Sequence, residues 1–131
     1  MSIKLFSASA GSGKTYTLTI EYIKLALSGT DSKGYFRRIL AVTFTIKAAE
    51  EMRSRIIEFL ELMAAFPYVE TISSEEQKKG YEIIEKVKNE LSAEGYEISA
   101  EQLAKRAKIA VQQILQDYGL FSVMTIDSFV Q

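Results

Sequence analysis

The sequence of 131 residues contains no cysteine and no histidine. A chain without cysteine forms no disulfide and offers no thiolate nucleophile, and a chain without either residue lacks the usual ligands of a zinc site. A histidine general base is excluded for the same reason. Any chemistry must therefore depend on phosphate positioning, carboxylates and magnesium. The lack of cysteine also fits a cytosolic protein.

A strong charge of one sign and long apolar runs are missing too. The formal net charge is −1 and the isoelectric point about 5.6, so the whole chain lacks the basic footprint of a general DNA-coating protein, although a local groove could hold a strand. No apolar run approaches transmembrane length, and segment 1–6 is too short for a signal peptide. The hydrophobic share of 47% is enough for one packed domain. We therefore expect a soluble cytoplasmic domain without a membrane partner.

A glycine-rich loop stands between a predicted strand, Ile3–Phe6, and a predicted helix, Tyr16–Leu27. In that context a Gly-Lys-Thr loop is typical of a phosphate cradle, because its backbone N–H groups surround the anion and the helix directs its positive end toward it. Lys14 would neutralise the outer phosphates, and the Thr15 hydroxyl would hold Mg²⁺. The sequence thus predicts a nucleotide site with Lys14 and Thr15 as its catalytic residues. The site consists of Ala8, Ser9, Ala10, Gly11, Ser12, Gly13, Lys14 and Thr15.

One position of this loop is unusual. Ala8 stands where such loops usually have their first glycine, which narrows the choice of P-loop families. The alternative interpretation is a Gly/Ser-rich surface turn that happens to contain Lys-Thr. The strand before the loop and the helix after it favour the phosphate cradle.

Two further strands are predicted. Arg38–Phe44 is a continuous apolar run, which is typical of a strand that is covered on both faces in a parallel sheet. The second is Leu120–Ile126, close to the last residue of the chain. We therefore expect an α/β fold of the P-loop NTPase (RecA-like) type, partial, with at least three parallel strands and flanking helices.

Helical periodicity predicts three more helices. The first follows a Thr45 N-cap and ends before Pro67, the only proline. The second is a charged helix within segment 68–98, which we expect to be a helical insertion at the surface. The third begins at a Ser99-x-x-Gln102 capping box and closes at Gly119.

Three segments together resemble the ATP-binding N-terminal part of UvrD/Rep-type superfamily 1 DNA helicases. They are the phosphate loop, the segment Ala41–Met52, which is similar to motif Ia of the family, and Thr125–Phe129, which is similar to the DNA-contacting motif that follows. The loop sequence Ala-Ser-Ala-Gly-Ser-Gly-Lys-Thr-Tyr-Thr-Leu is most similar to the exonuclease V beta-subunit branch, the RecB/AddA-like helicase–nucleases. The resemblance spans residues 1–131 apart from the unassigned section 68–98.

The resemblance implies a function. ATP and Mg²⁺ would be the cofactors, and ATP hydrolysis in the full-length protein would drive DNA unwinding or translocation in recombination and repair. Single-stranded and duplex DNA, and a partner subunit of a helicase–nuclease complex, would be the partners. Hydroxyls and helix N-termini would meet phosphates, while Phe44 or Phe129 would stack on bases. The DNA-binding residues would be Phe44, Thr45, Lys47, Thr125, Asp127 and Ser128.

Each of these DNA-binding residues also has a purely structural interpretation. The two phenylalanines could belong to the core, Thr45 and Ser128 could be helix caps, and Lys47 could be a solvated charge. Asp127 follows an apolar strand as a magnesium-holding aspartate does, but it lacks the adjoining glutamate, and its Thr-Ile-Asp-Ser-Phe context favours the DNA motif.

The chain also departs from the family pattern. Ile46 replaces the usual asparagine of motif Ia, and no glutamine motif, which reads adenine in the family, precedes Ile3. The Asp-Glu strand end that holds magnesium and the attacking water is missing. We therefore expect the N-terminal part of a motor domain from a larger protein, which by itself hydrolyses little or no ATP.

Two other interpretations stay open. The chain could be a self-contained P-loop phosphotransferase in which the charged helical section acts as a lid over the substrate. It could also be a non-catalytic module that binds a nucleotide and docks on a partner.

Overall fold

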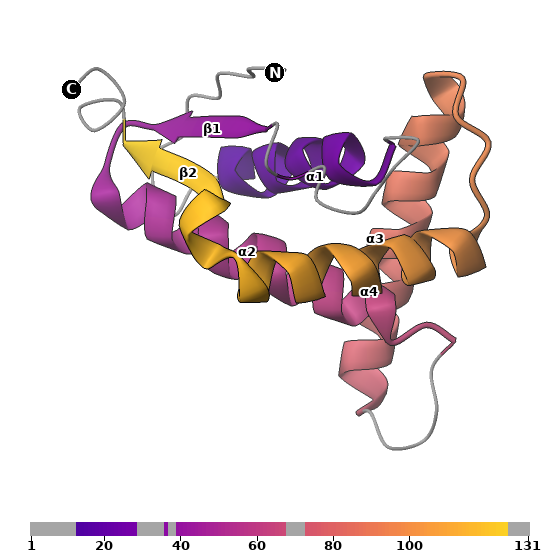
Figure 1. The fold of residues 1–131 in the computed structure, drawn as a ribbon. Coiled ribbons are helices and arrows are strands. Elements are labelled where there is room, and N and C mark those ends of the chain that lie inside the picture. Colours follow the sequence, from indigo (N-terminus) through magenta and orange to yellow (C-terminus); the bar gives the residue numbers. More distant parts are fainter. Residues whose placement is uncertain (1–12, 29–35, 37–38, 68–72, 126–131) are drawn as a thin grey trace.

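The structure, a computed structural model, describes residues 13–28, 36, 39–67 and 73–125. In chain order these ranges contain α1 (Gly13–Ser28), β1 (Leu40–Thr43), α2 (Ile46–Ala64), α3 (Ser74–Ala93), α4 (Ala100–Gln116), a 3₁₀ turn (Tyr118–Leu120) and β2 (Ser122–Thr125) (Figure 1). The predicted strand at 3–6 lies outside the described residues. None of the helices in these ranges combines the length and hydropathy that crossing a membrane requires. The predicted mixed α/β class is confirmed.

The two strands form a small parallel sheet. Leu40 lies opposite Ser122, and Thr43 lies opposite Thr125. All of β1 is buried, as its continuous apolar sequence predicts. Both strands are shorter than predicted. β1 ends where the Thr43 hydroxyl donates a 3.0 Å hydrogen bond to the carbonyl oxygen of Thr45, because this bond turns the chain out of the sheet.

Helix α2 is the centre of the helical layer. It contacts α1, α3, α4 and both strands. Figure 1 shows α2 and α4 below the strands and α3 at the end of the molecule away from them. The helix ends at Ala64, before Pro67, as predicted. Its buried residues recur at helical spacing and form one apolar stripe, made of Ala48, Ala49, Met52, Ile56, Phe59, Leu60 and Met63.

Helix α3 confirms the helix predicted within 68–98 but corrects its expected position. Ser73 caps it, accepting a hydrogen bond from the Glu76 N–H at 3.2 Å. Only its polar side lies at the surface. The apolar side is buried in the same core as α1, α2 and α4, because Ile83, Ile84, Val87 and Leu91 share one face of the helix. The apolar face of α3 therefore belongs to the common core.

Helix α4 has the predicted capping box. The Ser99 hydroxyl accepts from the Gln102 N–H, and the Gln102 side chain accepts from the Ser99 N–H. Arg106 then donates a 2.6 Å hydrogen bond to the carbonyl oxygen of Leu27, in the last turn of α1. A helix end leaves such carbonyls without intrahelical partners, so this contact both satisfies one of them and fixes α4 against α1.

A buried lysine joins α1 to α3. Lys24 Nζ lies 3.0 Å from a carboxylate oxygen of Glu21 and 3.1 Å from one of Glu90, and it also pairs with Glu94. Burial by itself would lower the pKa of Lys24, but the three carboxylates outweigh burial and raise that pKa above its ordinary value. For the carboxylate of Glu90, burial by itself would raise the pKa, but Lys86 and Lys24 outweigh burial and hold this pKa below its ordinary value. Lys24 and Glu90 are therefore both charged at neutral pH.

We expect the variant Glu90→Gln to lose less stability in acid than the wild type. Because the pKa of Glu90 is lower in the folded than in the unfolded state, its ion pairs stabilise the fold above the unfolded pKa, about 4.3. This contribution is lost as the pH falls through the folded pKa. The free energy of unfolding in urea at about pH 6 and about pH 3 measures the difference.

The matched control for this experiment is Glu85→Gln, since Glu85 is an exposed glutamate of the same helix. It should show the acid sensitivity of the wild type. A Glu90→Gln variant that loses as much stability as the wild type between the two pH values would contradict the assigned role of the network.

Candidate functional site

Helix α1 begins where the predicted phosphate loop ends. Its first residue is Gly13, and Lys14 and Thr15 follow in the first turn. Thr15 is fully buried, and its carbonyl oxygen accepts a 2.7 Å hydrogen bond from the Thr19 hydroxyl. The loop residues 8–12 and the side chain of Lys14 lie outside the described part of the chain. A helix that starts directly behind the loop is the arrangement that a phosphate cradle requires.

The first turns of α1 and α2 each carry a lysine and no carboxylate. The lysines are Lys14 and Lys47, whereas α3 has Glu75 and Glu76 in its first turn and α4 has Glu101. A carboxylate stabilises a helix N-terminus and a cation does not, because the helix dipole is positive at that end. α3 and α4 follow this rule, and α1 and α2 reverse it. A bound anion such as a phosphate would fit both reversed ends.

Thr45 connects β1 to α2 as the helix N-cap, which confirms the cap predicted from the sequence. Its backbone is extended, and its Oγ1 accepts a 3.0 Å hydrogen bond from the Ala48 N–H. A threonine hydroxyl that accepts one bond still has a hydrogen to donate. Phe44 on one side of the cap is 58% exposed and Ile46 on the other side is 69% exposed, and Lys47 is exposed as well. The core interpretation of Phe44 is therefore wrong.

The end of β2 lies directly beside this cap. Thr125 pairs in register with Thr43 and is buried, and the Thr43 hydroxyl lies 3.4 Å from the carbonyl oxygen of Met124. The parallel pairing brings the carboxyl ends of both strands to one edge of the sheet, as we expected for the two DNA-motif segments. Asp127, Ser128 and Phe129 lie outside the described residues.

A small pocket of about 210 Å³ separates the start of α2 from the end of β2. Within it Arg53 donates a hydrogen bond of 2.5 Å from Nη1 to the carbonyl oxygen of Val123. Our sequence analysis missed this arginine. Its spacing in the sequence could have indicated it, because Ile46, Ala49 and Arg53 fall on one side of a helix and therefore face the same neighbour. The lining residues are Ile46, Ala49, Arg53, Met124 and Thr125.

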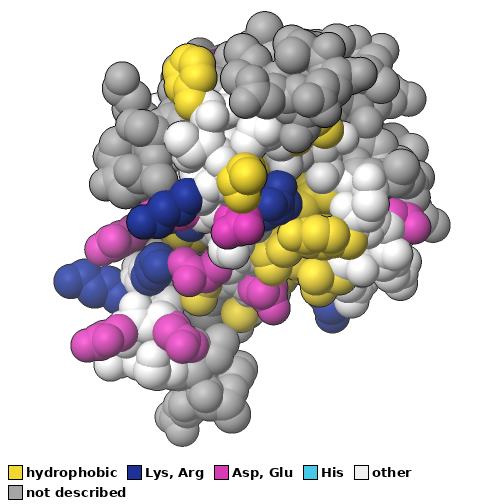
Figure 2. Space-filling model, turned by 90° about the vertical axis from the view of Figure 1, so that its left-hand side faces the viewer, with side chains coloured by type: hydrophobic (Ala, Val, Ile, Leu, Met, Phe, Trp, Pro, Cys, Tyr) yellow, Lys and Arg dark blue, Asp and Glu magenta, His cyan; other side chains and the backbone are white. Residues whose placement is uncertain are grey.

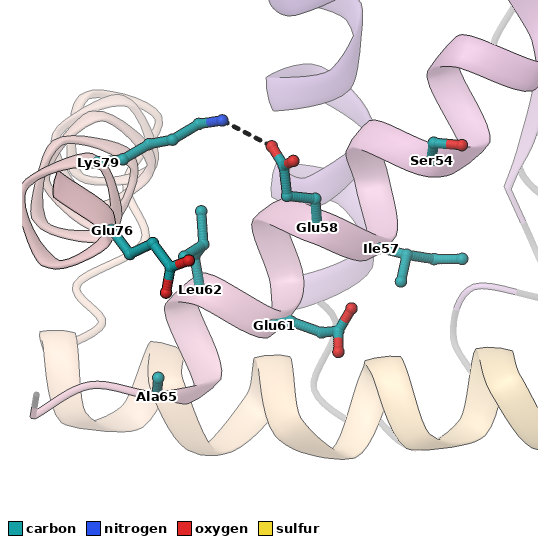
Figure 3. Close-up of a pocket in the computed structure, with 8 residues that line it drawn as sticks. All are labelled: Ser54, Ile57, Glu58, Glu61, Leu62, Ala65, Glu76 and Lys79. Carbon is teal, nitrogen blue, oxygen red and sulfur yellow. Dashed lines mark hydrogen bonds and ion pairs between the residues drawn. The ribbon is translucent and has the colours of Figure 1, made fainter. Parts of the chain in front are cut away.

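A larger groove of about 820 Å³ lies elsewhere, between α2 and α3 (Figure 3). Lys79 crosses it to Glu58 at 2.7 Å. Three glutamates and one lysine make the groove acidic, so it disfavours a phosphate. The groove is therefore separate from the site at the strand ends. Its lining residues are Ser54, Ile57, Glu58, Glu61, Leu62, Ala65, Glu76 and Lys79.

The side of the molecule where β1 leads into α2 carries charges of both signs, with apolar groups among them (Figure 2). The described residues on this face show no broad field of positive charge. Binding of a nucleic acid here would therefore depend on individual hydroxyls, helix ends and aromatic rings more than on long-range attraction.

Comparison with known proteins identifies the family. Residues 2–120 match the sequence profile of the UvrD/REP helicase N-terminal domain. The chain belongs to this family. The resemblance that we drew from three short segments is thus confirmed, and the phosphate-loop and motif Ia segments both lie within the matched range.

Several helicases of this family are similar in sequence. The RecBCD enzyme subunit RecB of Buchnera aphidicola is 32% identical over 134 residues, which is 98% of this chain and 10% of that protein. An ATP-dependent helicase/nuclease subunit of Lactobacillus acidophilus is 48% identical over 65 residues, 50% of this chain and 5% of that protein. The ATP-dependent DNA helicase UvrD2 of Mycobacterium tuberculosis is 51% identical over 49 residues, 37% of this chain and 7% of that protein.

The chain spans a tenth or less of the length of these three relatives. No solved structure matches it. These relatives are named as a RecBCD enzyme subunit, a helicase/nuclease subunit and a helicase. The family assignment of this chain rests on the match to the UvrD/REP helicase N-terminal domain.

We expect the variant Thr45→Ala to lower the free energy of unfolding by about 1 kcal/mol, because it removes the side-chain cap of α2. Thr45→Ser keeps the hydroxyl cap, and serine caps a helix at least as well as threonine, so we expect the free energy of unfolding to stay about equal to that of the wild type. Urea unfolding measures both values. The variant Ser99→Ala, which removes the equivalent cap of α4, provides the scale for comparison. Equal stability of Thr45→Ala and the wild type would show that the cap contributes nothing.

Proposed function

We propose that this chain is the ATP-binding part of a P-loop, RecA-like helicase motor, and that it couples ATP binding to movement along DNA. In the full-length protein, ATP hydrolysis would drive DNA unwinding in a cytoplasmic helicase–nuclease of the exonuclease V type, in recombination and repair. Support comes from the family assignment and from relatives that are named as a RecBCD enzyme subunit and as an ATP-dependent helicase/nuclease subunit. A subunit relationship such as that of RecB in the RecBCD enzyme would also give this protein a partner subunit.

The observation that carries this proposal is the reversed charge of two helix N-termini. Lys14 and Lys47 occupy first turns where the dipole disfavours a cation, and neither turn has a carboxylate. An anion at each end would remove the conflict. The first helix would take the phosphates of a nucleotide, and the second would take a phosphate of the DNA backbone.

The residues have distinct proposed roles. The backbone of the loop 8–13 would surround the β- and γ-phosphates, Lys14 would neutralise their charge, and the Thr15 hydroxyl would be a ligand of Mg²⁺. Magnesium, when bound with ATP, supplies the charge that stabilises phosphoryl transfer. At the other site Thr45, Lys47 and Thr125 would hold phosphates and Phe44 would stack on a base, with Asp127 and Ser128 in the same motif.

The two alternative functions receive less support. A phosphotransferase with α3 as a lid conflicts with the packing, because α3 is buried in the common core and its Glu90 and Glu94 pair with Lys24 of α1. In the described residues no cluster of three acidic side chains could hold a metal ion. A non-catalytic nucleotide-binding module would have the same phosphate loop as a helicase motor. It would differ from the motor in that it does not bind DNA.

We expect Mg·ATP to raise the melting temperature of the wild type and to leave that of Lys14→Ala unchanged. A ligand at about 100 times its Kd adds about 2.7 kcal/mol to the free energy of unfolding, which corresponds to several degrees in a domain of this size. The control is Lys47→Ala, which removes the same charge from the other reversed helix end and should keep the response to ATP. No shift in the wild type, or an equal shift in Lys14→Ala, would reject the nucleotide site.

We expect the variant Thr45→Asp to weaken binding of a fluorescent single-stranded oligonucleotide at least tenfold without loss of stability. Aspartate caps a helix as well as threonine does, and it benefits from the dipole, but its charge repels a phosphate. The matched control is Ser73→Asp, the same type of change at the N-cap of α3. Fluorescence anisotropy measures the Kd. If Thr45→Asp bound the oligonucleotide as tightly as Ser73→Asp, the start of α2 would not contact DNA.

A further inference from the structure

Arg53 connects the two segments that we propose to bind DNA, which are the start of α2 and the end of β2. It belongs to α2, which begins behind Thr45, and its guanidinium donates to the carbonyl oxygen of Val123 in β2, two residues before Thr125. The two partners are 70 residues apart in the chain. The bond therefore links the motif Ia helix to the strand that leads into the following motif.

The carbonyl that Arg53 binds faces away from β1, the neighbouring strand in the described part of the sheet. Carbonyl groups alternate in direction along a strand. The Met124 carbonyl lies 3.4 Å from the hydroxyl of Thr43 in β1, which indicates that the Val123 carbonyl faces away from β1. In the described residues the sheet has only the strands β1 and β2, and Arg53 supplies a donor on the side of β2 that faces away from β1.

Two successive carbonyls of β2 thus face opposite sides. The Met124 carbonyl faces Thr43 of β1, whose hydroxyl donates its shorter bond to Thr45, whereas the Val123 carbonyl accepts a bond from Arg53 of α2. A charge-assisted bond from a guanidinium is about twice as strong as a neutral one, and the planar fork of arginine holds its direction. The bond from Arg53 therefore joins α2 directly to the end of β2.

We propose that Arg53 is a positioning residue for the DNA site: it holds the end of β2 at the distance from the Thr45 cap at which both strand ends contact one DNA strand. This assignment rests on the proposed DNA-binding function. Arg53 is half-buried, and its guanidinium is already bonded to the backbone carbonyl of Val123. Its proposed role is therefore to place Thr125 and Thr45, not to contact a phosphate itself.

The test is the salt dependence of oligonucleotide binding by the full 131-residue chain and by the variant Arg53→Met. A positioning role predicts a Kd about tenfold higher, since a charge-assisted hydrogen bond is lost, with the slope of log Kd against log salt unchanged. A residue that contacts a phosphate directly would reduce this slope by about one ion. The control is Arg55→Met, which removes the same charge from the same helix. Arg55 pairs with Glu51 at 3.0 Å, a contact within α2. Its Kd should change about twofold or less.

A second measurement follows the strand directly. In ¹H–¹⁵N spectra without DNA, Arg53→Met should shift the amide signals of Val123, Met124 and Thr125, and Arg55→Met should leave them in place. Arg53→Lys retains a donor without the planar fork, so it should recover part of the wild-type affinity. It also serves as the comparison variant if Arg53→Met does not fold.

The possible failures are distinguishable. If the wild type binds no oligonucleotide, the proposed DNA function is overturned, and the role of Arg53 in DNA binding with it. If the wild type binds but Arg53→Met binds as tightly as Arg55→Met, or leaves the β2 signals unchanged, the DNA function stands and the positioning role is overturned. A slope reduced by about one ion overturns it in favour of a direct phosphate contact.

Discussion

The parallel pairing of β1 with β2 is the constraint on which the rest of the structure depends. Parallel neighbours cannot be joined by a tight turn and need a long crossover. Here the crossover carries α2, α3 and α4, and their buried faces, together with α1, form one core. The crossover is thus most of the domain. The pairing also brings two distant segments, Thr43–Thr45 and the end of β2, to the same edge of the sheet.

Three long cations fix how the helices are placed around this core. Lys24 reaches the carboxylates of α3, Arg106 reaches the last turn of α1, and Arg53 reaches β2. Each joins elements that apolar packing alone would leave free to slide, because burial of apolar surface has no preferred direction. The partners of the arginines are backbone carbonyls, whose positions are set by secondary structure, so these contacts define register as well as proximity.

Local features of this fold were predictable, and features that depend on distant partners were not. The caps at Thr45 and Ser99 and the end of α2 before Pro67 follow from interactions within a few residues, and the sequence pattern predicted them. The end of β1 depends on the turn made by Thr43, which no periodicity shows. The burial of α3 and the bond of Arg53 depend on residues far along the chain. At the site, the sequence predicted which segments meet, but not the arginine that connects them.

The lack of carboxylates in the first turns of α1 and α2 also affects the dynamics of the free chain. Such ends forgo the roughly 0.3–1 kcal/mol that a carboxylate contributes at an exposed helix N-terminus. On this ground alone we expect these ends to open more readily than the starts of α3 and α4, and their amide hydrogens to exchange faster with the solvent. An anion bound there would close them. If phosphates bind these turns as we propose, the order of the two helix ends is coupled to occupancy, and amide exchange at the same turns would report the departure of the phosphate.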